Sequence, residues 1–160
     1  LGYALPLERS AKQHSDDMVR HDFFSHTSPV PGRQTPHQRI KNQGVRFNFT
    51  AENIADIFGI EYENGEPVYS PEQNGGYFSY RHRGEPIPAR TYLSLARSVV
   101  QGWMDSKGHR QNILHRNAVY LGVGAAHYKD NSFFGIDRFR ITQNFGGAPI
   151  RETKTSHAAN

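Results

Sequence analysis

The segment 103–114 constrains the fold of this chain more than any other stretch. It joins the only tryptophan, Trp103, to a glycine, Gly108, and a histidine, His109. The apolar positions before it follow the three- and four-residue spacing of an amphipathic helix, and glycine commonly ends a helix. We therefore expect a long helix over 90–107 that stops at Gly108.

Further turns should follow this glycine. Residues 109–114 have the composition for one or two of them, and we expect Ile113 and Leu114 to be buried there. Gly102 lies inside the long helix, where it costs about 1 kcal/mol relative to alanine. Close packing of another chain segment against Gly102 would explain its presence.

Two helical patterns lie in the first third of the chain. The spacing over 4–20 places one set of residues on a single face: Leu7, Ala11, His14 and Met18. We interpret His14 as a core-edge histidine with a local hydrogen bond. A second, short helix is predicted over 35–43, with Thr35 as its N-cap and Gly44 as its left-handed stop.

The middle of the chain is less regular. A short helix is predicted over 50–58, capped by Thr50 and with Glu52 in its first turn, where the helix dipole favours a carboxylate. Glycines and prolines interrupt 59–89, yet this segment holds too many tyrosines for a plain linker. We expect an ordered excursion that borders the functional cleft, with a strand over 77–83.

Two β-rich segments close the chain. Residues 118–128 and 136–145 have the alternation and the intervening turn of an antiparallel hairpin. Helices first and strands last favour an α+β fold, a small antiparallel sheet covered by helices. We expect a single domain over 1–160, with its core at about 4–146 and a polar tail over 147–160.

Composition excludes several classes of protein. The chain has no cysteine, so disulfides and thiol catalysis are impossible. Its formal charge of +4 comes from 19 basic and 15 acidic residues without like-charge runs, which favours an ordinary mixed surface over nucleic-acid binding. No apolar stretch is long enough for a transmembrane segment. No signal peptide is visible, but the first residue is Leu1, so we expect that a leader or anchor has been removed.

The chemistry-bearing residues are scattered histidines and carboxylates. Phosphate-binding loops, the His-Glu-x-x-His motif and the nucleophile elbow of hydrolases are all absent. We hypothesise that the fold brings His26, Glu52 and His109 into one cleft. Two imidazoles and a carboxylate suit Zn²⁺ or another divalent metal with open water positions, and they also suit acid–base work on water. By itself, His26 is better explained as a surface turn residue, and the other motifs are what favour a place in the cleft.

Five motifs occur in the same order as in a known family. The sequence resembles the bacterial, cysteine-free branch of the CAP superfamily, named after cysteine-rich secretory proteins, antigen 5 and pathogenesis-related 1 proteins, whose domain is also called SCP-like. The resemblance runs from about Leu7 to Gly146. Its motifs are Phe-Phe-Ser-His-Thr-Ser at 23–28, Ala-Glu-Asn-Ile-Ala at 51–55, the tryptophan-to-leucine segment 103–114, Leu-Gly-Val-Gly at 121–124 and Thr-Gln-Asn-Phe-Gly at 142–146.

The resemblance implies an α-β-α sandwich in an extracellular or cell-envelope protein. It also implies a cleft of two histidines and two acidic residues, which binds a divalent metal in some members. His26, Glu52 and His109 match three of these positions. Ser106 stands where many eukaryotic members have glutamate, and Asp105 lies one residue away from that position.

Three roles follow for such a cleft. We expect a binding or interaction module that takes a metal or small ligand, a lipid or a protein partner, with the excursion contacting the partner. The alternative is a metal-dependent or acid–base hydrolase, peptidase-like, with Glu52 as the base. A histidine pair without metal could also act as a pH-responsive network.

Overall fold

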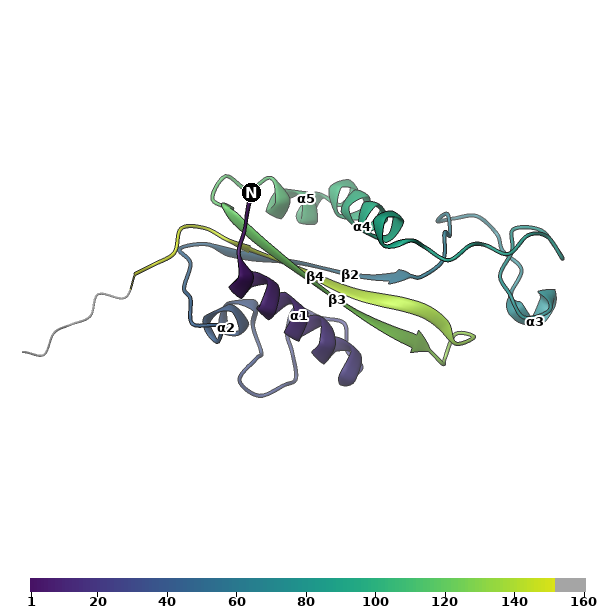
Figure 1. Ribbon diagram of the computed structural model, residues 1–160, viewed down its shortest axis with the longest axis horizontal. Helices are drawn as coiled ribbons and strands as arrows, with labels where there is room; N and C mark the ends of the chain where they lie inside the picture. The colour runs from purple at the N-terminus through teal and green to yellow at the C-terminus, as the bar shows by residue number, and fades with distance from the viewer. Residues whose placement is uncertain (152–160) are drawn as a thin grey trace, which may run out of the picture.

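The computed structural model describes residues 1–151 as an α-β-α sandwich, which confirms the predicted fold class (Figure 1). The strands are β1 (Gly2–Tyr3), β2 (Thr50–Phe58), β3 (Tyr120–Asp130) and β4 (Ile136–Gly146). The helices are α1 (Leu5–Arg20), α2 (Pro36–Lys41), α3 (Pro71–Asn74), α4 (Tyr92–Asp105) and α5 (Lys107–Ile113). Of the predicted tail, 152–160 lies outside the described residues.

The sheet has the order β1-β3-β4-β2, with the predicted β3–β4 hairpin at its centre. The helices α1 and α2 lie on one face and α4 and α5 on the other (Figure 1). Two glycines of β3 let α1 lie directly on the hairpin. A Cβ added at Gly122 would come within 2.0 Å of the Glu8 nitrogen, and one at Gly124 within 2.2 Å of the Lys12 nitrogen.

The predicted helix over 50–58 is wrong, because this segment is the edge strand β2. It pairs antiparallel with β4, from Thr50 opposite Gly146 to Phe58 opposite Arg138. A helix this short is marginally stable on its own, so an N-cap and one favourable charge are not enough to make the segment helical. Pairing with a long strand provides the backbone bonds. Alternation places Ala55 and Ile57 against the α4 layer.

The core is divided between the two faces of the sheet. On the α4 side, Leu95, Val99 and Trp103 pack against Ile141 of β4. On the α1 side, the predicted inward face of the helix is confirmed, because Leu7, Ala11, His14 and Met18 are fully buried. The predicted α2 is also confirmed: Thr35 accepts a hydrogen bond from the Gln38 nitrogen, and Gly44 has a φ of +79°.

The junction between α4 and α5 lies at Ser106 and not at Gly108. Ser106 has an extended backbone, and its carbonyl accepts the Arg110 N–H at 2.9 Å as α5 begins. Gly108 therefore lies inside α5, and the prediction that it ends the long helix is wrong. Ile113 packs against the α4 core, whereas Leu114 is 67% exposed, so its predicted burial is also wrong.

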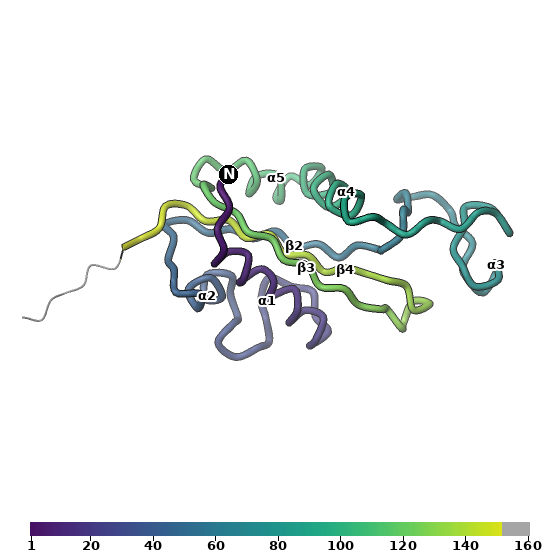
Figure 2. The backbone as a smooth tube through the Cα atoms, viewed as in Figure 1, coloured from purple at the N-terminus to yellow at the C-terminus, as the bar shows by residue number. Residues whose placement is uncertain are grey.

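The excursion 59–89 leaves the sheet at the end of β2 and returns just before α4 (Figure 2). It is ordered by aromatic contacts with the tip of the hairpin, since Phe78 stacks on Phe133 at 5.7 Å. The expected strand over 77–83 is reduced to a single bridge, between Tyr69 and Ser79.

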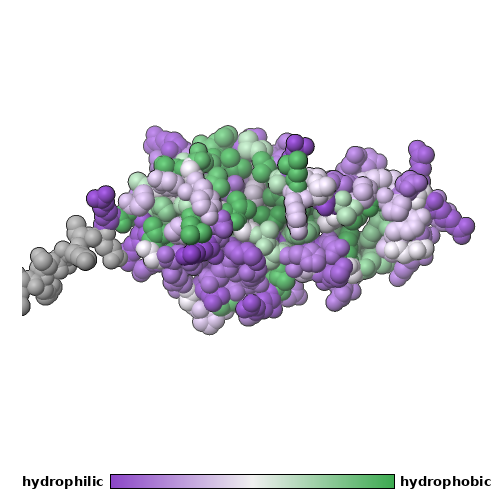
Figure 3. All heavy atoms as spheres, in the orientation of Figure 1, coloured by the Kyte–Doolittle hydropathy of each residue, from purple (hydrophilic) through white to green (hydrophobic). Residues whose placement is uncertain are grey.

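The outer face of the hairpin is only partly covered. Val123 of β3 is 41% exposed, and Ala125 and His127 beside it are exposed as well. Figure 3 shows apolar residues gathered over the α4–α5 layer and the adjoining sheet, with hydrophilic residues over α1 and α2. Within residues 1–151, no helix has the length and hydropathy needed to cross a membrane.

Candidate functional site

The site is built around Glu52, which β2 directs toward the α1 layer. The Nδ1 atom of His26 lies 2.8 Å from Glu52 Oε1, so these two predicted residues meet. The Arg39 guanidinium donates through Nη2 to both carboxylate oxygens, at 3.0 and 2.8 Å. Sequence reasoning missed Arg39. Its sequence signal is weak: a cation next to an apolar residue, Ile40, inside the predicted helix over 35–43.

Arg39 also holds the loop that carries His26. Its guanidinium donates to the carbonyls of His26, Arg33 and Gln34 at 3.0 to 3.3 Å. Burying a guanidinium is costly unless its charge is paired and its donors have acceptors. Both Nη atoms of Arg39 meet this condition, whereas its buried Nε has no partner within residues 1–151. Arg39 therefore fixes the loop and the carboxylate together, and it determines where the imidazole of His26 lies.

His14 approaches Glu52 from α1. Its Nε2 lies 2.9 Å from the Ser25 carbonyl, which confirms the expected local hydrogen bond, and 3.8 Å from Glu52 Oε1. The side chain is fully buried, deeper than the core edge that the sequence predicted. Burial lowers the pKa of His14, so its neutral form is favoured.

His109 reaches the site from α5. Asn112 ties α5 to β2, donating to the Glu52 carbonyl at 3.2 Å and to Asn53 Oδ1 at 2.8 Å, and Asn53 donates to the His109 carbonyl at 3.2 Å. The Nδ1 atom of His109 is buried without a hydrogen-bond partner. Burial lowers the pKa of His109, and the nearby charge of His26 lowers it further. Sequence reasoning missed the two asparagines, although both lie in the motifs.

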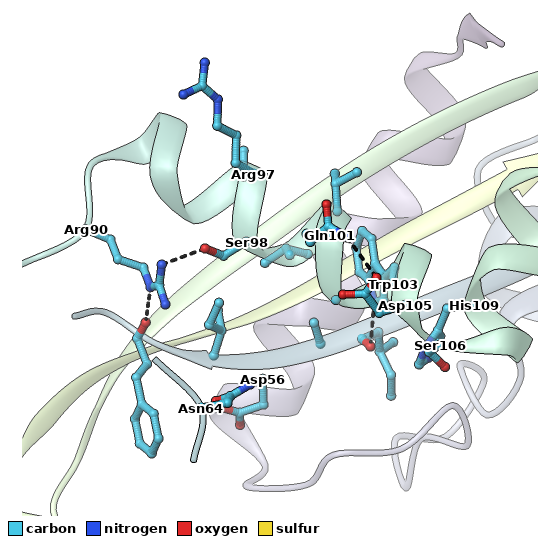
Figure 4. A pocket seen from close by; sticks show the side chains of 18 of the residues that line it. Asp56, Asn64, Arg90, Arg97, Ser98, Gln101, Trp103, Asp105, Ser106 and His109 are labelled. Carbon is cyan, nitrogen blue, oxygen red and sulfur yellow. Dashed lines mark hydrogen bonds between the residues drawn. The ribbon is translucent and has the colours of Figure 1, made fainter. Parts of the chain in front are cut away.

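The remaining two predicted residues differ in placement. Ser106 lies beside His109 (Figure 4), and its side chain makes no cap hydrogen bond to α5. Asp105 is exposed and accepts a hydrogen bond from Gln101 at 2.9 Å. It contacts neither histidine. Asp105 therefore does not replace the glutamate that many eukaryotic members have at the position of Ser106.

The donor set only partly fits a metal ion. No group of three histidine and acidic side chains within residues 1–151 is arranged to hold one. Glu52 cannot serve as a third ligand as it lies, because Arg39 occupies both of its oxygens. The imidazole of His26 is 51% exposed and that of His109 has a free buried nitrogen, so two nitrogen donors are available. Metal binding stays a prediction.

A groove of about 1160 Å³ runs from His109 and Ser106 along β2 and beneath α4 (Figure 4). Residues 54–58 form its strand side, and Gly102 lies on its helix side. A Cβ added at Gly102 would meet no atom within 4 Å, so the expected close packing there is wrong and the glycine opens onto the groove. The excursion borders this groove through Tyr62 and Asn64.

Comparisons with known proteins identify the family of the chain. The chain matches the cysteine-rich secretory protein family, CAP, over residues 1–145. It is 30% identical to the uncharacterized protein YkwD of Bacillus subtilis over 118 residues, 74% of this chain and 32% of that protein. It is 29% identical to the uncharacterized membrane protein YlbC of the same organism over 140 residues, 88% of this chain and 27% of that protein.

A solved structure has the same fold. The crystal structure of an extracellular protein containing an SCP domain, from Bacillus anthracis, matches with a TM-score of 0.55 at 25% identity, over 92% of this chain and 34% of that chain. The present chain thus spans between about a quarter and a third of each of these relatives. The motifs, the sandwich and the cysteine-free composition lead to one assignment: the chain belongs to the CAP family of cysteine-rich secretory proteins, in its cysteine-free bacterial form.

Proposed function

We propose that this CAP domain is a binding module that acts outside the cell or at its surface. Its ligand would bind at His26 and His109 and extend into the groove that His109 lines. The observation that carries this proposal is the buried, unpartnered Nδ1 of His109 at the end of the groove. An unpaired buried polar atom costs about 1–3 kcal/mol, and a bound ligand would relieve that cost. The extracellular SCP-domain neighbour supports the location.

Geometry favours binding over hydrolysis. A peptidase-like mechanism with Glu52 as base needs a carboxylate oxygen free to accept a proton from water. Both oxygens of Glu52 instead accept hydrogen bonds from Arg39, and the side chain is 1% exposed. Glu52 is better placed to orient His26 through Nδ1, as carboxylates orient imidazoles at metal sites.

A divalent ion is the first ligand to test. His26 and His109 would supply two nitrogen donors, and water would complete the coordination. We expect one Zn²⁺ per chain when metal-stripped protein is titrated calorimetrically at neutral pH. Binding should be lost in both His26→Ala and His109→Ala.

The matched control is His37→Ala, since His37 is exposed on α2 away from the cleft. This variant should bind zinc as the unmodified chain does. Zinc binding that survives substitution of both cleft histidines would place the ion elsewhere. Absence of zinc binding in the unmodified chain would restrict the cleft to organic ligands.

A further inference from the structure

The outer edge of β2 faces the groove and carries backbone groups at alternate residues. Gly59 N–H donates to the Asp137 carbonyl on the β4 side at 2.7 Å, so odd-numbered residues direct their backbone groups inward. Even-numbered residues therefore direct theirs outward, which explains why three of their carbonyls accept side-chain donors. These bonds are Asn112 to the Glu52 carbonyl, Trp103 to the Ile54 carbonyl and Arg90 to the Phe58 carbonyl, at 3.2, 3.0 and 3.0 Å.

Asp56 lies between Ile54 and Phe58 in this series and has no such cover. In the part of the chain that the structure describes, neither its backbone N–H nor its C=O has a partner on this edge, and neither does the Ile54 N–H. Unpaired strand-edge groups are a template for another strand. Because the flanking carbonyls are already occupied, the template is a short window centred on Asp56.

The groove provides room for a chain along this window. Its strand side is residues 54–58, which extend about 13 Å between the first and last Cα atoms. On its helix side, Gly102 leaves additional space, because it has no side chain and no atom lies within 4 Å of an added Cβ. A narrow extended chain fits this shape, and in an antiparallel pair one of its residues would exchange both backbone bonds with Asp56.

The charged residues that line the groove indicate which ligand group would bind at the end near His109. Asp105 lines the groove near His109, is exposed, and forms no ion pair within residues 1–151; it accepts a hydrogen bond from the neutral amide of Gln101. At the other end Arg90 is already paired with Glu61, and Arg138 with Asp56. Arg97 also lines the groove without an ion pair within residues 1–151, but its side chain points away from β2 (Figure 4). Near His109 the uncompensated charge is therefore the Asp105 carboxylate, which suits a basic residue or a free amino terminus.

We propose that the groove binds an extended peptide that adds as a strand to the outer edge of β2 opposite Asp56, with a positively charged group toward Asp105. The inference rests on the proposed binding function and names the ligand class of the groove. Backbone hydrogen bonds supply affinity in such strand addition, and side-chain contacts supply selectivity.

The test starts from a phage-displayed library of random linear octapeptides selected on the folded chain. The peptides enriched are synthesised, and their affinities are measured for three proteins: the unmodified chain, Gly102→Leu and Gly108→Leu. Leucine at 102 projects into the groove, whereas Gly108 lies on α5 outside the groove lining, also with no atom near an added Cβ. We expect at least tenfold weaker binding to Gly102→Leu and unchanged binding to Gly108→Leu. Circular dichroism checks that both variants are folded.

Amide hydrogen exchange, followed by NMR residue by residue, supplies the second readout. The amides of Ile54 and Asp56 should exchange rapidly in the free chain and slow at least tenfold with peptide bound. Those of Ala55 and Ile57, which already pair with β4, should be slow in both states. Methylation of every second peptide nitrogen should abolish binding only when the methylated nitrogens are those that face β2. Separately, Asp105→Asn should weaken the binding of a basic peptide at low salt.

Three results would overturn the proposal. The first is a library that yields no peptide whose binding depends on Gly102, and the second is binding that leaves the Ile54 and Asp56 amides unchanged. The third is protection of these amides without peptide as protein concentration rises, which would assign the edge to a second copy of the chain. Zinc titration is independent of all three, so the peptide inference can fail while the histidine cleft stands, or the reverse.

Discussion

Arg39 and Glu52 form a fully buried ion pair between α2 and β2, with Nη2 2.8 and 3.0 Å from the two carboxylate oxygens and the side chains 0% and 1% exposed. The pair joins a helix of one layer to the edge strand of the sheet. Because the same guanidinium donates to the His26 carbonyl, it links the fold to the candidate site.

Breaking this pair should destabilise the chain strongly. Arg39→Met leaves the Glu52 carboxylate buried without its partner, which typically costs about 3–5 kcal/mol. Urea denaturation should show this loss. Lys41→Met, on the same helix but exposed, should change the free energy of unfolding by less than about 0.5 kcal/mol. Equal effects of the two substitutions would show that the buried pair is not a stabilising feature.

Two glycine-to-alanine substitutions should have opposite signs. Gly124→Ala places a Cβ 2.2 Å from the Lys12 nitrogen, so α1 must move away from β3, and we expect a loss of about 1–3 kcal/mol or more. Gly102→Ala meets nothing within 4 Å and should gain up to about 1 kcal/mol, because alanine favours the helix. Thermal unfolding measures both, and a stabilised Gly124→Ala would contradict the close packing of α1.

The Trp103 indole should contribute through its hydrogen bond as well as through packing. Trp103→Phe removes the donor to the Ile54 carbonyl, a 3.0 Å bond, and leaves a smaller ring in the α4 core. We expect the free energy of unfolding, measured by urea denaturation, to fall by about 1–3 kcal/mol. On the same helix Tyr92 is 87% exposed, so Tyr92→Phe should have almost no effect. A Trp103→Phe variant as stable as the unmodified chain would refute this role.

Stability should fall as the pH drops below the ordinary histidine pKa of 6.5. Burial lowers the pKa of His14 in the folded chain, so the unfolded chain binds a proton first as the pH falls. The stabilisation from the neutral imidazole is therefore complete above about pH 6.5 and is lost toward the lowered pKa. His109 acts in the same direction, since burial and His26 also lower its pKa.

Urea denaturation at several values between pH 7.5 and 5 would test this pH dependence. His14→Gln should flatten the profile, whereas His37→Gln, at an exposed position, should leave it unchanged. A profile in His14→Gln as steep as that of the unmodified chain would show that His14 does not cause the loss.

Local patterns predicted the parts of the fold whose burial is periodic along the chain. The inward face of α1, the cap of α2 and the β3–β4 hairpin are each specified by neighbouring residues, and the motif order identified the family. The segment 50–58 failed because Thr50 and Glu52 satisfy local rules for a helix start, while its actual partner, β4, lies far away in the sequence.

For the candidate site, the sequence likewise predicted part of the answer: which residues belong to it, but not their roles. Its motifs pointed to His26, Glu52 and His109 before any contact was known, because the histidines and the glutamate lie in recognisable segments. Their roles were not readable, because Arg39 occupies the glutamate only after α2 packs against β2. Whether a carboxylate can bind a ligand depends on which groups already hold it.

The sequence by itself thus determined the family, the layered architecture and the residues near the cleft, since these follow from local periodicity and motif order. The tertiary structure alone decided that β2 is an edge strand, that Glu52 is paired with Arg39, and that Gly102 opens onto a groove. The physical reason is that pairing and accessibility are relations between distant segments. They acquire a definite geometry only when the layers pack.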